Sequence, residues 1–408
     1  MFILTVIITW RLWLTGRPYP HAPLFSWLPQ LPPPFDFVMA GILLAALAAM
    51  AIMRDPRLPI RIVLAAGLLL ALPDQTRWQP YIIHFIVIPG SLLLLPWGRR
   101  DRWTNRDVEW GLMPARLLLA FTYLYSGLQK FNYDFFTWLF GWITEPLLDW
   151  LDIAPTAVPP MLLVPLAFLA ATAETLAGAL LLFARWRRPA AIFLIGMHLF
   201  ILLMIGPAGR GTNVAVWPWN VAMIGTLWLL FVRRRTPADA RVPAFPAAAW
   251  WRAMRTAQRD GAPSRTGAAA TAGTLILFGL LPLLSFADLW DSYPSFSIYS
   301  GTLYEARIYV ASEDRGMLPP YVVELIDADG GFDPTFWAVH EFTAPPYPEP
   351  RVMLALGREL ARRATHADVY LQIAGRPDLS TGERRVRIFR CPLGGGEPVE
   401  EKLRADSD

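Results

Sequence analysis

Eight long apolar segments limit the possible folds of this chain more than any other feature, because so many apolar side chains cannot be exposed to water. Hydrophobic residues make up 54% of the sequence and charged residues only 17%. Most of the segments are long enough, at ~1.5 Å per residue, to cross a hydrocarbon core of about 30 Å. The sequence therefore predicts an all-α polytopic membrane bundle of about eight spans, followed by a small α+β extracytoplasmic domain. The predicted spans are roughly 36–53, 58–73, 80–97, 109–131, 158–184, 189–206, 213–232 and 267–287.

Arginine clusters indicate how such a bundle is oriented. They fall between predicted spans one and two, three and four, five and six, and seven and eight. Eight alternating spans place all four clusters on one side, which the positive-inside rule assigns to the cytoplasm. The clusters are Arg54, Arg57 and Arg61; Arg99, Arg100, Arg102 and Arg106; Arg185, Arg187 and Arg188; and Arg233 to Arg235 with Arg241 to Arg265. The prediction is an integral protein of a bacterial inner membrane with its C-terminal domain outside. The net charge of +4 then belongs to membrane loops and indicates no nucleic-acid partner.

Composition divides the chain into four parts. Residues 1–35 form an apolar, proline-rich N-terminal segment, whose first fifteen residues fit an interfacial helix, an incomplete span or part of an uncleaved signal. Residues 36–287 form the bundle, and 236–266 within it read as a cytoplasmic linker rich in Ala, Pro and Arg. The apolar, proline-broken stretch 132–157 is typical of a re-entrant or interfacial segment that caps the bundle.

Residues 289–408 form the predicted extracytoplasmic domain. Alternating hydrophobicity predicts strands at 302–310, 321–326, 369–374 and 385–391, and an amphipathic pattern predicts a helix at 350–363. The single cysteine, Cys391, excludes an intramolecular disulfide, and no spacing of Cys and His indicates a metal site.

Three polar residues are expected near the middle of the membrane. Counting along the predicted spans places Glu174 and His198 about 14–15 Å from the cytoplasmic ends of their helices, and Asn220 close to that level. Polar groups inside a bilayer are costly and are often functional. The three residues fit a hydrogen-bonded clamp between helices and an active site equally well.

A second polar group is expected nearer the outer face, around one of only two lysines in the chain. The other 35 basic residues are arginines, which stay charged, whereas a partly desolvated lysine can lose its proton and act as a base. A lysine at a helix end also commonly extends its ammonium to the interface. Helical spacing places Tyr123, Ser126 and Gly127 on the face of Lys130. Further candidates for substrate or quinone binding near this level are His84, Asn213, Trp217, Asp74 and Arg77. For Trp217 the alternative is an interfacial belt, and for Asp74 and Arg77 a loop salt bridge.

Five motifs in order resemble those of a known family. They lie at 74–80 (DQTRWQP), 125–132 (YSGLQKFN), 174–182 (ETLAGALLL), 196–198 (GMH) and 217–223 (WPWNVAM). Together they resemble the horizontally transferred transmembrane (HTTM) domain, the family that includes vitamin K-dependent γ-carboxylase. The resemblance covers roughly residues 60–232. A more distant likeness, to DoxX-type membrane proteins, depends on the four-helix pattern alone.

The resemblance implies a reaction and a cofactor. In the carboxylase a membrane lysine deprotonates a reduced naphthoquinone, reaction with O2 yields a strong base and an epoxide, and CO2 adds to the deprotonated glutamate. Residues 126–131 match the stretch that holds this lysine, so the resemblance implies that Lys130 is the base and that His198 matches a family histidine. The implied cofactor is a reduced menaquinone or vitamin K-type quinol. Gln129 stands where the family has a second lysine, and the short tail has no counterpart of the large lumenal domain.

The sequence thus favours a membrane enzyme in which Lys130 acts on a lipid-soluble hydroquinone, with Glu174, His198 and Asn220 holding the site or relaying protons. Its partners would be the lipid bilayer, the quinone and a peptide or protein substrate at the extracytoplasmic face. One alternative is a non-catalytic scaffold that anchors the tail domain. Another is a DoxX-like component of quinone-linked thiol or sulfur oxidation, for which the lack of a cysteine pair argues against direct disulfide chemistry.

Overall fold

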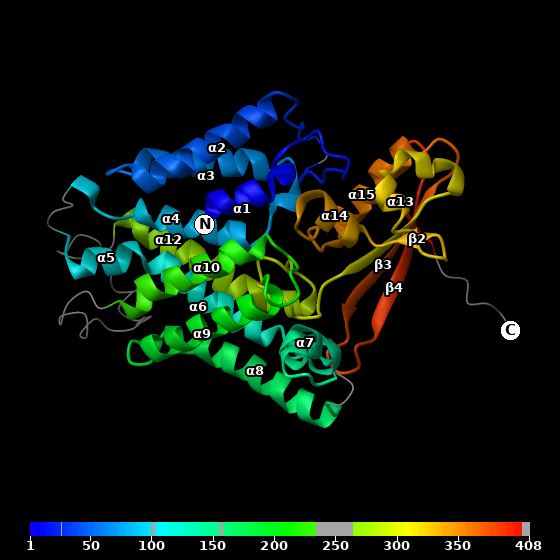
Figure 1. Cartoon of the computed structure of the whole chain (residues 1–408). Helices are drawn as coiled ribbons and strands as arrows, with labels where there is room; N and C mark the ends of the chain where they lie inside the picture. Colours follow the sequence, from blue (N-terminus) through cyan, green and yellow to red (C-terminus); the bar gives the residue numbers. More distant parts are fainter. Residues whose placement is uncertain (26, 99–102, 155–157, 234–263, 402–408) are drawn as a thin grey trace.

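The molecule consists of a helical bundle and a tail domain that packs against one end of it (Figure 1). The computed structural model describes residues 1–408 except 26, 99–102, 155–157, 234–263 and 402–408, so most of the predicted linker 236–266 lies outside the described residues. The bundle elements before the predicted capping segment 132–157 are α1 (Phe2–Ile8), η1 (Trp10–Trp13), α2 (Phe35–Ile52), α3 (Arg57–Ala71), η2 (Gln75–Arg77), α4 (Pro80–Leu92), α5 (Asn105–Gly111) and α6 (Met113–Leu128). The remaining bundle elements are η4 (Phe135–Leu139), α7 (Phe140–Trp150), α8 (Pro160–Leu181), α9 (Arg187–Ile205), α10 (Val216–Leu227), η6 (Trp228–Val232), α12 (Arg265–Thr274), η8 (Leu275–Leu280) and η9 (Leu281–Ala287).

Among the residues that the structure describes, four helical segments are long and apolar enough to cross a membrane, so the predicted count of eight spans is not supported. The four are Phe35–Ile52, Met161–Leu181, Arg187–Ile205 and Arg265–Ala287. Only 22% to 33% of the residues in them are buried inside the protein, so their apolar side chains require a hydrocarbon solvent. These are the helices of an integral membrane protein. The other four predicted spans form helices of 13 to 17 residues, which extend about 20–25 Å and are shorter than a bilayer core.

The central helix of the bundle is α6, which is buried by protein and not by lipid. It contacts α4, α8, α12 and η8, and 13 of its 16 residues are buried. A helix surrounded by other helices can carry polar side chains if they find partners there. This explains why α6 is less apolar than the outer helices and why it carries candidate site residues.

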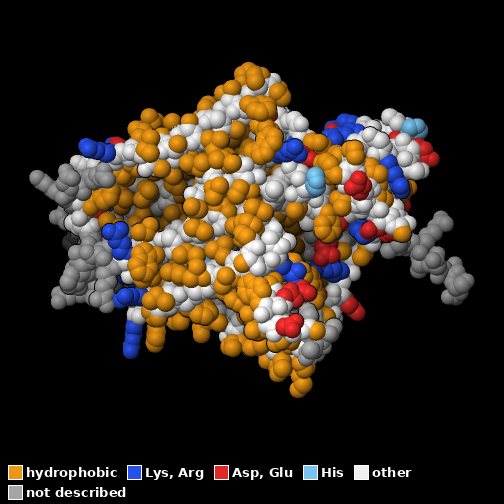
Figure 2. Space-filling model, in the orientation of Figure 1, with side chains coloured by type: hydrophobic (Ala, Val, Ile, Leu, Met, Phe, Trp, Pro, Cys, Tyr) orange, Lys and Arg blue, Asp and Glu red, His pale blue; other side chains and the backbone are white. Residues whose placement is uncertain are grey.

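Apolar side chains cover the surface of the bundle, whereas charged ones gather over the tail and at the opposite end (Figure 2). The arginine-bearing turns between α2 and α3 and between α8 and α9 lie at the end away from the tail (Figure 1). The N-terminal residues are not a span in this structure, because α1 has seven residues and packs against α2 and α10. The predicted capping segment 132–157 is helical through η4 and α7, which contact α8 and α9.

The tail domain is a five-stranded antiparallel sheet with helices on it, so the predicted α+β class is confirmed. Its elements are β1 (Glu305–Tyr309), η10 (Ser312–Met317), α13 (Pro320–Val323), β2 (Gly331–Phe332), α14 (Pro334–Phe342), α15 (Pro350–Arg363), β3 (Val369–Pro377), β4 (Arg384–Cys391) and β5 (Val399–Glu401). The strand order is β2-β1-β3-β4-β5. Helix α15 packs on the inner face of β3, where Leu371 and Ile373 are fully buried.

Most predicted elements of the tail match the structure, and one is wrong. Segment 321–326 forms a helical turn and not a strand, because Pro319 and Pro320 precede it and proline favours the first turn of a helix. Cys391 is buried in the sheet, and burial raises the pKa of its thiol to about 11, which leaves it unreactive at neutral pH.

The tail docks on the turn that follows α6. Arg384 of β4 pairs with Asp134 at 3.1 Å and donates to the carbonyl of Gly301 at 2.7 Å. The amide of Asn132 donates to the carbonyl of Ser300 at 2.6 Å. The tail is therefore fixed within a few residues of Lys130.

Candidate functional site

A cavity of about 190 Å³ lies inside the bundle beside the C-terminal end of α6. Its wall consists mostly of aromatic and aliphatic side chains from η4, α7, α8, α9 and α10. Polar groups come from α6 and the turn after it, α8, α9 and α10, and they include six of the twelve residues that the sequence singled out. These polar residues are Thr122, Tyr123, Ser126, Lys130, Glu174, His198 and Asn220. The two groups that were predicted at different depths thus meet in one cavity.

Lys130 and Glu174 form an ion pair in the wall of this cavity. Lys130 Nζ lies 3.0 Å from Glu174 Oε2. It also donates to the carbonyl of Ser126 at 3.0 Å and to Ser126 Oγ at 2.8 Å. The three hydrogens of an ammonium thus have three acceptors. With side chains only 11% exposed each, both partners are held inside the protein.

The prediction that Lys130 lies well above Glu174 is wrong, for two reasons that concern helix geometry. Helix α6 ends at Leu128, and the segment after it turns into the cap instead of continuing toward the outer face. Side chains on a helix also point toward its N-terminus, so the long side chain of Lys130 reaches back by one turn to Ser126. It meets Glu174 at the level that the sequence assigned to the glutamate alone.

Two glycines let α6 and α8 approach closely enough for this pair to form. A Cβ on Gly127 would lie 2.4 Å from the backbone nitrogen of Thr175, and one on Gly178 would lie 2.2 Å from that of Leu124. Such distances are far below van der Waals contact, so only glycine fits at either position. The backbones of α6 and α8 therefore lie in direct contact at these two glycines.

A chain of hydrogen bonds links α6, α9 and α10 across the cavity. The amide nitrogen of Asn220 donates to the carbonyl of Val216 at 2.8 Å, so its oxygen accepts from His198 Nδ1 at 2.6 Å. His198 Nε2 then accepts from the hydroxyl of Tyr123 at 2.7 Å. This order describes a neutral imidazole with a defined tautomer. Of the predicted clamp of Glu174, His198 and Asn220, the bond between His198 and Asn220 is present, whereas Glu174 pairs with Lys130 and has no direct bond to His198 among the described contacts.

Three other candidates lie around the cavity without lining it. A hydrogen bond of 2.9 Å joins His84 Nε2 to Thr122 Oγ1, and Thr122 lines the cavity. Asn213 donates to the hydroxyl of Tyr299 at 2.8 Å, and Tyr299 also lines it. The indole nitrogen of Trp217 donates to the carbonyl of Thr212. Its side chain does not line the cavity, whereas that of the neighbouring Trp219 does.

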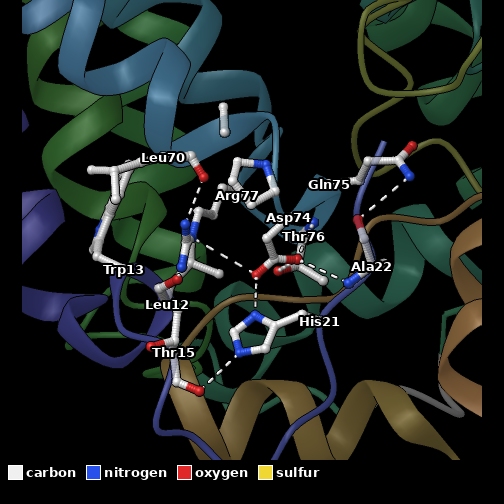
Figure 3. Close-up of polar contacts among 12 residues, drawn as sticks. Leu12, Trp13, Thr15, His21, Ala22, Leu70, Asp74, Gln75, Thr76 and Arg77 are labelled. Carbon is white, nitrogen blue, oxygen red and sulfur yellow. Dashed lines mark hydrogen bonds and ion pairs between the residues drawn. The ribbon is translucent and has the colours of Figure 1, made fainter. Parts of the chain in front are cut away.

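Asp74 and Arg77 belong to a different buried cluster (Figure 3). The carboxylate of Asp74 pairs with Arg17 at 2.5 Å and with His21 at 3.0 Å, whereas Arg77 is 3.7 Å away. Arg77 instead donates to the carbonyls of Leu12 and Leu70. The cluster ties the N-terminal segment to the loop between α3 and α4, and none of these residues lines the cavity of Lys130.

Sequence reasoning missed Arg17, His21 and Trp219. Arg17 and His21 lie in a proline-rich segment with no periodic pattern, so nothing in the sequence indicated that they contact Asp74. Trp219 was grouped with Trp217, and a helical turn of about 100° per residue turns two side chains at i and i+2 to different faces. The packing of α10 against α9 and α1 decides which of them faces the cavity.

One known family matches part of this chain. Its model, DoxX, matches residues 111–207, which are 97 of the 408 residues and contain α6, α7, α8 and α9 with Lys130, Glu174 and His198. No curated protein and no solved structure matches the chain. The predicted likeness to DoxX-type membrane proteins is confirmed over this stretch, and the likeness to the carboxylase family stays a prediction. The helices that surround the Lys130–Glu174 pair are thus similar to DoxX.

Proposed function

We propose that this chain is a membrane enzyme of the HTTM or vitamin K-dependent carboxylase type, in which Lys130 removes a proton from a lipid-soluble hydroquinone. One observation carries the proposal: the amine of Lys130 and the carboxylate of Glu174 are 3.0 Å apart in the wall of an otherwise apolar cavity. A structural ion pair needs two buried partners, but it needs no cavity beside it.

The cavity suits the flat ring of a quinol. Phe135, Phe140 and Trp219 supply aromatic wall, and a few polar side chains line the cavity as well. Two further lining residues, Phe193 and Phe200, are 47% and 38% exposed on the bundle surface. A ligand dissolved in the bilayer can therefore reach the cavity sideways, with its ring inside and its isoprenoid chain in lipid.

Proton transfer within the ion pair would prepare the base. In the charged pair Lys130 is a protonated ammonium, so its nitrogen has no lone pair with which to accept a proton. Transfer of one proton to Glu174 yields an amine and a carboxylic acid, which are both neutral and suit an apolar cavity. The amine then accepts the hydroxyl proton of the bound ligand, as a general base must. When bound, a reduced menaquinone or vitamin K-type quinol supplies, with O2, the strong base that deprotonates an acceptor for addition of CO2.

The far side of the cavity offers groups that would orient such a ligand. The hydroxyl of Tyr123 and the imidazole of His198 form a fixed pair there. The indole nitrogen of Trp219 is buried and has no partner among the described residues. A buried N–H without an acceptor is unfavourable, and a ligand oxygen in this cavity would relieve it.

In the proposed arrangement the arginine-rich turns face the cytoplasm of a bacterial cell, as the positive-inside rule requires. The tail, at the other end of the bundle, then lies outside the inner membrane. Its docking on Asn132 and Asp134, next to Lys130, supports a role in presenting a peptide or protein substrate.

The test is formation of quinone epoxide by the purified protein in lipid, supplied with vitamin K hydroquinone or menaquinol under O2. Loss of a general base lowers turnover by roughly 10²–10⁴-fold, and we expect this for Lys130→Ala. A matched control is Thr172→Val, on the lipid side of α8 two residues from Glu174, which should keep full activity. Epoxide formation by Lys130→Ala at the wild-type rate, or none by wild type, would contradict the proposal.

The match to DoxX supports a second candidate, a membrane scaffold or a DoxX-like quinone-linked component without carboxylase chemistry. In a scaffold the ion pair would only join α6 to α8. Lys130→Ala and Glu174→Ala would then lower thermal stability in detergent equally, and no quinol-dependent reaction would be found.

A further inference from the structure

A second hollow, of about 500 Å³, lies where the last membrane span meets the tail domain. One wall is the end of η9, with Ser285 and Phe286, and the other is the inner face of β3 and β4. Gln129, the residue before Lys130, closes the hollow on the bundle side. It is separate from the cavity of Lys130, and the chemistry proposed there does not use it. We call this hollow the interface groove.

Two arginines of the interface groove have no acidic partner in the described part of the chain. Arg387 lies opposite Ile373 in the sheet, and Arg385 is two residues away, so both side chains leave the same face of β4. Neither has a carboxylate within 4.0 Å among the residues that the structure describes, whereas Arg376 nearby pairs with Asp288 at 3.2 Å. Among the described residues, the only other charged one that lines the groove is Glu400, so three described arginines face two described carboxylates with one positive charge in excess.

The other wall of the groove is continuous with the lipid-facing surface of a span. The segment Arg265–Ala287 is long and apolar enough to cross a membrane. At its end Leu283, Phe286 and Leu289 are 53%, 44% and 71% exposed. This places the arginines at the depth where an acyl chain beside the span would end in its headgroup.

We propose that the interface groove binds the phosphate of an anionic phospholipid such as phosphatidylglycerol. The guanidinium groups of Arg385 and Arg387 would hold the phosphate, for which the planar fork of arginine is well suited. The acyl chains would cover the exposed side chains of η9. A soluble acidic peptide would match the arginines but leave that apolar wall bare, so the lipid accounts for both halves of the groove.

The experiment measures lipid binding by native mass spectrometry of the full chain, with phosphatidylglycerol and phosphatidylcholine in separate titrations. Each arginine near a lipid surface contributes about fivefold, so Arg385→Gln with Arg387→Gln should lower the preference for phosphatidylglycerol roughly 30-fold. The control is Arg307→Gln with Arg390→Gln, which removes the same charge from paired arginines outside the groove. Screening by salt should keep its effect below about threefold. If the double change impairs folding, Arg385→Gln alone, at an exposed position, should lose about fivefold.

Two soluble ligands test whether the arginines bind a whole phospholipid, its headgroup alone or an acidic peptide. Glycerophosphoglycerol carries the same headgroup without chains, and a hexaglutamate peptide carries charge without phosphate. Weak binding of both, with tight binding of the lipid, is the expected result. Equal retention of the two lipids by wild type, headgroup binding as tight as that of the whole lipid, or a preference for the peptide would each overturn the proposal.

Discussion

The pair of Lys130 with Glu174 and the cluster of Arg17, Asp74 and Arg77 are both buried ionic groups, and they differ in what surrounds them. Asp74 is fully buried beside Arg77, which donates to the carbonyl of Leu12 in the N-terminal segment (Figure 3). The pair instead forms part of a cavity wall. Burial alone therefore does not identify a functional site: the cluster has partners and no space, whereas the pair has partners and space for a ligand.

The largest expected effect is a loss of activity on changing Lys130, which the cluster of Arg17, Asp74 and Arg77 should not share. Lys130→Arg keeps a positive charge beside Glu174, but an arginine does not give up its proton under ordinary conditions. Quinol-dependent turnover should fall by roughly 10²–10⁴-fold while the thermal midpoint stays close to that of wild type. Turnover that survives this change would remove Lys130 from the role of base and make the pair as structural as the cluster.

The next effect concerns the stability of the cluster. Asp74→Asn keeps the shape of the side chain but leaves Arg17 and Arg77 buried without a counter-charge, so we expect a loss of about 3–5 kcal/mol. Thermal unfolding in detergent measures it, with Asp55→Asn, in an exposed pair with Arg57, as the control that leaves the midpoint unchanged.

The same change has a defined pH dependence. Burial opposes the charge of Asp74, but Arg17, His21 and Arg77 outweigh it and hold the pKa of this carboxyl well below its ordinary value. A lowered pKa stabilises the fold above about pH 4 and loses this contribution as pH falls toward the folded-state value. The difference between wild type and Asp74→Asn should therefore be full at pH 7 and shrink only in strong acid. A difference that vanishes near neutral pH would assign the effect to another group.

A smaller effect tests the contact that positions the pair. Gly127→Ala forces a methyl group against the backbone of Thr175 and should destabilise the protein by about 1–3 kcal/mol. It should also lower turnover, because separating α6 from α8 separates Lys130 from Glu174. Gly196→Ala on α9 meets nothing within 4 Å and serves as the matched control. Equal midpoints for the two variants would mean that the helices adjust without strain.

The smallest effect concerns the hydrogen-bond chain on the far side of the cavity. Tyr123→Phe keeps the ring but removes the hydroxyl that donates to His198, which should lower the stability by about 1 kcal/mol. Thermal unfolding with and without added quinone measures it. If the chain orients the ligand, the variant should also gain less stability from the quinone than wild type does, and an equal gain would limit Tyr123 to a structural role.

Much of the architecture could be predicted from local patterns. The helix 350–363 and the strands near 369–374 and 385–391 follow directly from apolar periodicity. The apolar segments of the bundle were also recognised, but their number as spans was not, since hydropathy does not distinguish a helix buried in protein from one buried in lipid. Helix α6 is the clearest case, because its neighbours supply the environment that a bilayer supplies to α2, α8 and α9.

By itself, the sequence determined that this is a membrane protein with a small α+β tail, that Lys130, Glu174 and His198 are unusual where they stand, and that residues around them are similar to a known membrane family. Only the tertiary structure decided that Lys130 pairs with Glu174, that Trp219 and not Trp217 faces the cavity, and that Asp74 belongs to another cluster. The physical reason is that local patterns report one helix at a time. The level at which two helices cross depends on where each ends and on contacts such as Gly127 against Thr175, which join residues far apart in the chain.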